Sequence, residues 1–272
     1  MSDAAENQPI RDRFRVRFAK TGLLRWIGHR DLQRLWERLL RRADLRLSMS
    51  AGFNPKPRIS FPSALALGVE GLDEVVEIEL AEPITAEQLQ QRLAADGQPG
   101  LSIRSVQLVA RFHADGTAIA SFPGLGKAQV HSSEYEITLP PMIDRQRIDT
   151  AIAGAKQVGR ISIGRKGKDV TADIATTFPR FERRDQILHL TQINTPSASL
   201  KPTDVLTAIG LGDLIEHGAI IRRTKVVLAD EMERPHAAAS PTLPAAHPSE
   251  TDAGTTSHSS HTHHTTLSRE QH

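Results

Sequence analysis

His29 and Asp31 are the side chains best suited to general acid–base chemistry in the most basic region of the chain. A histidine beside a carboxylate can take a proton from a bound substrate near neutral pH. Both residues stand where a helix is predicted to begin, and residues two positions apart on a helix do not face each other. Two interpretations stay open: His29 is a catalytic base, or it is a structural histidine that hydrogen-bonds the backbone where the helix starts.

Five arginines follow His29 at spacings that place them on one side of the predicted helix. They are Arg30, Arg34, Arg38, Arg41 and Arg42, and at about 100° per residue they fall within an arc of about 120°. The opposite side carries an apolar ridge formed by Leu32, Leu35, Trp36, Leu39, Leu40 and Ala43. We expect a helix from about Arg30 to Ala43 that presents guanidinium groups, which suit contacts with phosphate. The alternative is a solvated face, partly neutralised by Glu37 and Arg41 at i, i+4.

Two further basic groups lie outside this helix. In Ala51–Arg58, Pro55 and Pro57 restrict the backbone, so a stiff loop should present Asn54, Lys56 and Arg58. The second group is a basic turn in the other half of the chain, containing Arg165, Lys166 and Lys168. All of these residues are predicted to bind RNA or a partner protein.

Charge and composition narrow the class of protein. The net charge of the 272 residues is only +2, yet residues 11–60 hold fourteen Lys or Arg against four Asp or Glu. Such a basic segment favours a polyanionic partner. The chain has no cysteine, which excludes disulfides, thiolate zinc sites and cysteine-ligated iron–sulfur clusters. No cofactor is predicted, and no signal peptide or membrane span, so we expect a cytoplasmic protein.

The elements that must position these residues follow a β-α-β-β-α-β order. In the first half, alternating or periodic apolar residues predict strands at 13–19, 45–48, 75–80 and 101–109, with helices at 30–43 and from Thr85 onward. The first and third strands of this arrangement are neighbours. Arg15 and Arg17 could therefore face Glu77 and Glu79 as cross-strand ion pairs, and would then not be free to bind a ligand.

The same order recurs in the second half. Strands are predicted at 135–139, 170–174, 187–193 and 219–228, with helices at 144–158 and from Pro202 onward. We therefore expect an α+β protein with two tandem ferredoxin-like units that have antiparallel sheets. The predicted boundaries are 12–109 for the first unit, 110–132 for a linker and 133–229 for the second unit.

A tail is predicted from residue 230 to residue 272. It is rich in His, Ser, Thr and Pro and nearly lacks large apolar side chains, a composition typical of disorder. His258, His261, His263 and His264 could hold a transition metal loosely, or the histidines could simply reflect low complexity. No metal site is assigned.

Several of these motifs together resemble the radical-SAM-linked protein family, a domain of unknown function. The resemblance rests on LRWIGHRDLQRLWERLLRRA, SMSAGFNPKPRISF, Leu67-Gly68-Val69-Glu70, GRKGKD, Leu200-Lys201-Pro202 and Arg222-Arg223-Thr224, and covers about residues 12–229. Members of the family occur beside, or fused to, radical-SAM proteins with a cobalamin-type domain. The resemblance implies partnership with such an enzyme and brings no established reaction. Gly28 departs from the Ser or Thr expected to cap the arginine helix.

Three functions from different classes stay open. The first is a non-catalytic accessory protein of a radical-SAM enzyme that binds structured RNA, such as tRNA or rRNA, through the arginine face. The second is an RNA-processing or RNA-modifying enzyme that uses His29. The third is a protein-only interaction module that docks its arginines on the radical-SAM partner. We prefer the first because phosphate is the commonest target of so dense an arginine face.

Overall fold

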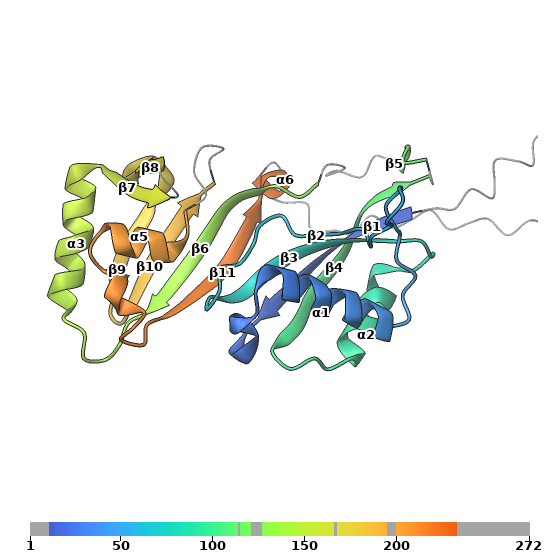
Figure 1. Cartoon of the computed structure of the whole chain (residues 1–272), viewed down its shortest axis with the longest axis horizontal. Coiled ribbons are helices and arrows are strands. Elements are labelled where there is room, and N and C mark those ends of the chain that lie inside the picture. Colours follow the sequence, from blue (N-terminus) through green and yellow to red (C-terminus); the bar gives the residue numbers. More distant parts are fainter. Residues whose placement is uncertain (1–10, 114, 121–126, 166–167, 195–199, 233–272) are drawn as a thin grey trace, which may run out of the picture. The chain divides into compact units, whose positions relative to one another are not determined.

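The computed structural model describes residues 11–113, 115–120, 127–165, 168–194 and 200–232 (Figure 1). These residues form a mixed α+β protein and lie in one compact unit. The described helices are α1 (His29–Arg42), α2 (Ala86–Ala95), α3 (Arg145–Val158), α4 (Ile174–Thr177), α5 (Pro202–Ala208) and α6 (Ala229–Met232), with 3-10 turns η1 (Gly22–Trp26) and η2 (Gly212–Leu214).

The described strands form one large, mostly antiparallel sheet and a separate hairpin. The large sheet contains β1 (Arg11–Lys20), β2 (Ile59–Ser60), β3 (Glu70–Leu80), β4 (Leu101–Phe112), β5 (Ala118–Ala120), β6 (Val130–Thr138), β9 (Arg180–Arg184), β10 (Ile187–Ile193) and β11 (Ile220–Leu228). The hairpin pairs β7 (Arg160–Arg165) with β8 (Lys168–Asp173). The strand order is β5-β4-β1-β3-β11-β6-β10-β9, with β2 added on β3.

The two halves of the chain share this sheet, whereas the sequence predicted separate antiparallel sheets. The connection is short and parallel: Arg222 and Arg223 of β11 lie in register with Glu70 and Gly71 of β3. It can form because the two-residue strand β2 covers only Ile78 and Glu77 of β3, near the end of that strand. The first residues of β3 are therefore open to β11.

The first half buries the apolar ridge of α1 as predicted. Leu32, Trp36 and Leu39 share one apolar cluster with Phe14, Val16 and Phe18 of β1 and with residues of β3 and α2. Thr85 caps α2, and the side chain of Gln88 bonds back to the Thr85 backbone, completing the expected capping box.

The predicted strand 45–48 lies beside β3 but forms only one bridge, between Leu47 and Leu80. The chain leaves β3 there because Met49 turns back to pair with Pro57 within the loop. The regular pairing with β3 is instead made by β2.

In the second half, the predicted strand 170–174 is not in the large sheet. Residues 168–173 form β8 of the hairpin, and Asp173 then caps α4 by accepting a hydrogen bond from the Thr176 amide at 2.9 Å. The sheet position belongs to β9, which pairs with β10. The sequence of β9, RFERR, buries only Phe181 and so gave no alternating apolar signal.

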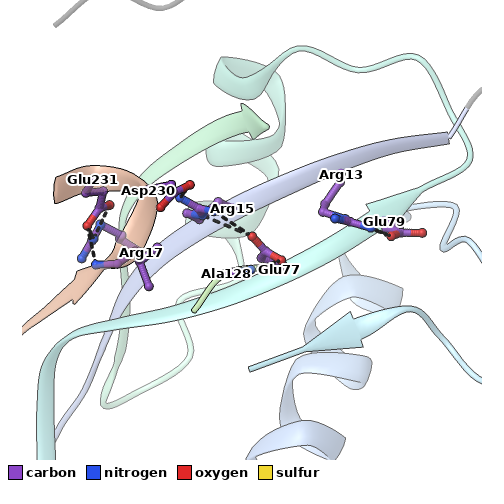
Figure 2. A network of polar contacts seen from close by, with 9 residues as sticks. Arg13, Arg15, Arg17, Glu77, Glu79, Ala128, Asp230 and Glu231 are labelled. Atoms are coloured by element: carbon purple, nitrogen blue, oxygen red, sulfur yellow. Dashed lines mark hydrogen bonds and ion pairs between the residues drawn. The ribbon is translucent and has the colours of Figure 1, made fainter. Parts of the chain in front are cut away.

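The sheet face opposite α1 carries an ionic network between β1 and β3 (Figure 2). Arg15 binds Glu77 at 3.0 Å, as predicted, and Arg13 binds Glu79 at 2.8 Å. Arg17 does not face either glutamate, because the register places Val75 opposite it. It binds Asp73 at 2.5 Å instead.

Two residues of the predicted tail take part in this network. Asp230 and Glu231 lie in α6 and bind Arg15 at 2.9 Å and Arg17 at 2.6 Å, as Figure 2 shows. Although burial opposes its charge, the hydrogen bond that Arg17 donates to Glu231 helps to raise the pKa of Arg17. The described fold therefore continues to Met232, and the rest of the predicted tail lies outside the described residues.

Candidate nucleic-acid interface

The arginine face of α1 is exposed along its whole length. All five of its arginines, Arg30, Arg34, Arg38, Arg41 and Arg42, have exposed side chains, while the leucine side of the helix is buried. Gly28 is the N-cap in extended conformation and contributes no side-chain hydrogen bond. The helix is therefore held by its apolar side, and its positive side is available to solvent.

The arginines on this face differ in how far they are neutralised. Arg42 forms two 2.5 Å hydrogen bonds with Asp96, which raise the pKa of Arg42 and lower that of Asp96. Arg34 lies 3.4 Å from Asp31. The predicted Glu37–Arg41 ion pair is replaced by a bond from the Arg41 side chain to the Glu37 backbone oxygen at 3.2 Å.

Arg30, Arg38 and Arg41 have no carboxylate partner in the described part of the chain. The contrast with β1 is direct, since Arg15 and Arg17 each bind two carboxylates. Fixed positive charge that is not compensated internally is the part of this surface that can bind an anion.

The loop after α1 presents two of its three predicted side chains. Asn54 and Lys56 are exposed, and the loop is closed by a hydrogen bond from the Ser50 amide to the Lys56 oxygen at 2.8 Å. Arg58 is half-buried and donates to the Met49 oxygen at 3.1 Å, so it stabilises the loop. Arg58 is therefore a weaker candidate for ligand binding than Lys56.

The second basic group lies on the hairpin. Arg165 ends β7 and Lys168 begins β8, opposite each other in register. Lys166 and the side chains of Arg165 and Lys168 lie outside the described residues. The structure places these positions on a different element from α1 and brings no described contact between the two groups.

His29 and Asp31 make different contacts, and no described hydrogen bond joins them. The His29 ring is exposed and lies edge-on to Phe61, with ring centroids 5.2 Å apart. Asp31 is turned to Arg34. The predicted structural role of His29, a hydrogen bond to the backbone, is also not seen in the described region; its contact is aromatic.

A pocket of about 600 Å³ adjoins the first residues of α1. Its lining residues come from α1, from the 62–69 loop, from strands β6, β10 and β11, and from the start of α5; they include Gly28, His29, Ser63, Leu65, Ser133, Tyr135, Gln192, Asn194, Lys201 and Arg223. This size is ordinary for a small-molecule site.

The floor of the pocket is the place where the helix-covered face of the sheet becomes polar. Strands β10 and β6 first pair Leu188 with Ile137 and Leu190 with Tyr135, which are buried in the core. The next pair on this face is Gln192 with Ser133, both only 3% exposed. Two positions further along each strand, an amide side chain (Gln192) and a hydroxyl (Ser133) thus take the place of apolar side chains.

Arg223 borders the pocket and is held by Glu74 in a bidentate ion pair, with Nε donating to Oε1 at 2.7 Å. Its Nη1 donates to the Ser63 hydroxyl at 3.0 Å. Burial disfavours the charge, but Glu74 more than offsets it and raises the pKa of Arg223. Nearby Lys20 is buried, which lowers its pKa, and donates to the Ile27 oxygen at 3.1 Å.

The sequence prediction missed this pocket. The available signal was a polar residue on the apolar side of an alternating strand, namely Ser133 before Tyr135 and Gln192 after Leu190. Such a signal is weak without knowledge of which strands are neighbours.

A comparison with known protein families shows which family this chain belongs to. The profile of a family described as an uncharacterized protein conserved in bacteria, DUF2344, matches residues 13–202. The chain belongs to the DUF2344 family. The match spans α1, the loop after it and most of the pocket, so the arginine face and the pocket floor on β6 and β10 lie in the DUF2344 region. No curated protein matches the chain.

Two features are absent from the described part of this DUF2344 protein. No group of three or more His, Asp or Glu side chains there could hold a metal ion. None of the helices described is both long and apolar enough to span a bilayer.

Proposed function

We propose that this protein is a non-catalytic accessory protein that binds structured RNA through the arginine face of α1. The observation that carries the proposal is that Arg30, Arg38 and Arg41 are exposed on a helix anchored by its other side, without a carboxylate partner among the described residues. Guanidinium groups fixed along about three turns of helix can contact successive phosphates of a folded RNA.

The distribution of the other arginines supports this proposal. Many arginines on strands are matched by carboxylates, as in Arg13–Glu79, Arg111–Asp12 and Arg222–Glu70. The large sheet therefore compensates much of its positive charge internally, whereas three arginines of α1 lack a carboxylate partner in the described region. Lys56 and Asn54 would extend the contact along the adjoining loop.

We also propose that the large sheet consists of two ferredoxin-like units joined edge to edge. The strand orders β4-β1-β3-β2 and β11-β6-β10-β9 support this assignment. The resemblance to radical-SAM-linked proteins suggests the partner. Because the chain has no cysteine to ligate an iron–sulfur cluster, such an enzyme would supply the radical chemistry, in the cytoplasm.

The test is binding of bulk bacterial tRNA, measured by fluorescence anisotropy between about 50 and 200 mM salt. Substituting Arg30, Arg38 and Arg41 with Glu should weaken binding about a hundredfold at low salt and reduce the log–log salt slope by about 2 to 3. The matched control reverses three exposed arginines elsewhere, Arg104, Arg145 and Arg160, with the same change in net charge. It should stay within about threefold of the unaltered protein.

An equal loss in both triple variants would reduce the effect to net charge and reject the α1 site. Absence of tRNA binding, combined with salt-sensitive binding of a radical-SAM enzyme after nuclease treatment, would establish the protein-only module. Cleavage or modification of RNA by the isolated chain, abolished in His29→Ala, would establish the enzyme.

A further inference from the structure

The pocket beside α1 contains a buried polar group that has no partner among the residues the structure describes. Within that part of the chain the Oε1 atom of Gln192 accepts no hydrogen bond, although the side chain is 3% exposed and lines the pocket. Buried amide groups are nearly always paired, because an unpaired one loses its hydration without compensation. An unpaired amide at the floor of an open pocket therefore indicates a position for a ligand donor.

The charges of the lining residues indicate whether the ligand carries negative or positive charge. Among the described lining residues, His29, Lys201 and Arg223 can carry positive charge, and none is Asp or Glu. Arg223 is compensated by Glu74, whereas the described region offers Lys201 no ion-pair partner. The mouth of the pocket therefore favours an anionic group near Lys201.

The remaining lining residues suit a planar, partly apolar body. Leu65, Val69 and Leu200 supply buried apolar surface, while Gln192 lies near the end of β10 and Asn194 is the first residue after it. Carboxamides of this kind can donate and accept side by side, which is how proteins commonly read the edges of nucleobases.

We propose that this pocket binds a nucleoside phosphate, with its base edge at Gln192 and its phosphate near Lys201. The ligand can be a free mononucleotide or the end of an RNA strand, since His29 links the rim of the pocket to the arginine face. The proposal does not require that α1 bind RNA, because its own groups come from β10 and from the residue before α5.

The test uses the full chain and isothermal titration with AMP, GMP, CMP and UMP. At least one should bind, and both Gln192→Leu and Lys201→Gln should weaken it about tenfold, the usual effect of losing one hydrogen bond or charged contact. Gln186→Leu is the matched control: its Oε1 is also buried and has no partner in the described segments, but it lies outside the pocket lining. It should bind as the unaltered protein does.

Gln192→Leu removes an unpaired polar group, so its melting temperature should not fall, and Lys201→Gln changes an exposed side chain. If one of these two variants misfolds, the nucleotide affinity of the other variant tests the proposal. Failure of all four mononucleotides to bind at millimolar concentration would overturn the proposal. So would an affinity in Gln192→Leu and Lys201→Gln that equals that of the unaltered protein.

A 5′-phosphorylated RNA hexamer distinguishes the two sources of the ligand. A pocket for free nucleotides binds the hexamer no better than the mononucleotide. A pocket for an RNA end binds the hexamer more tightly, and the Arg30, Arg38 and Arg41 charge reversals remove only that gain. Mononucleotide binding that survives these reversals would uphold the pocket even if RNA binding by α1 fails.

Discussion

Glu74 of β3 lies between two buried cations, Arg223 of β11 and Lys20 of β1. It forms the bidentate pair with Arg223 and also attracts the charge of Lys20, whose pKa it raises against the larger lowering by burial. The carboxylate is 4% exposed. One anion therefore balances two cations at the place where the two halves of the sheet meet.

Glu74→Gln should be more damaging than Arg223→Met. The first leaves two buried cations uncompensated and should lower the free energy of unfolding by about 3–5 kcal/mol. The second keeps the attraction between Glu74 and Lys20, so it should lower the free energy of unfolding by less than half as much. Urea unfolding of both variants measures the difference; equal losses would contradict the shared role of Glu74.

The residues just after β11 should contribute to stability through Arg15 and Arg17. A chain ending at Ala229 lacks Asp230 and Glu231, and each arginine then keeps one carboxylate, Glu77 or Asp73. We expect about 1–3 kcal/mol less stability than in a chain ending at Met232. The measurement is thermal unfolding of the two truncated chains, which differ only by Asp230, Glu231 and Met232.

Charge reversal on α1 should leave the fold intact. Arg30, Arg38 and Arg41 are exposed and make no ion pair in the described region, so the triple Glu variant should lose no more than about 1 kcal/mol. Circular dichroism melting curves test this. A collapsed transition would show that these side chains support the helix and would defeat their assignment to ligand binding.

Three half-buried aspartates predict how stability changes with acid. Hydrogen bonds from Arg42, Arg147 and Arg183 lower the pKa of Asp96, Asp213 and Asp149. Because the folded-state pKa lies below the unfolded one, the stabilisation is complete at neutral pH and is lost as the pH falls through the folded-state values, below about 4. Replacing the three aspartates by Asn should destabilise at pH 7 and make little difference near pH 2. A difference between the two proteins that does not shrink in acid would argue against these pairs.

Local sequence patterns predicted the helices and strands whose apolar spacing or capping residues are visible in the sequence itself. The spacing of Leu32, Leu35, Trp36 and Leu39 predicted α1, and Thr85 with Gln88 predicted the start of α2, because these features depend on neighbours within one turn or two. The alternation of β1 predicted which arginines leave the core, and the register with β3 confirmed the Arg15–Glu77 pair.

Features that depend on distant segments were not predictable in this way. Arg17 finds Glu231 at the other end of the chain, and β9 enters the sheet with a single buried Phe181. The pocket exists only because β10, β11 and the start of α1 come together, so Gln192 read alone was an ordinary strand residue.

The pairing of β3 with β11 also sets the order of events during protein synthesis. The ribosome releases β1 and β3 long before β11 and α6, so the nascent first half has Glu74 without Arg223, and Arg15 without Asp230. The edge of β3 near Glu70 is then an open template for a strand. Emergence of β11 and α6 closes that edge and supplies the missing charges, so the first half reaches its final stability only after the second has emerged.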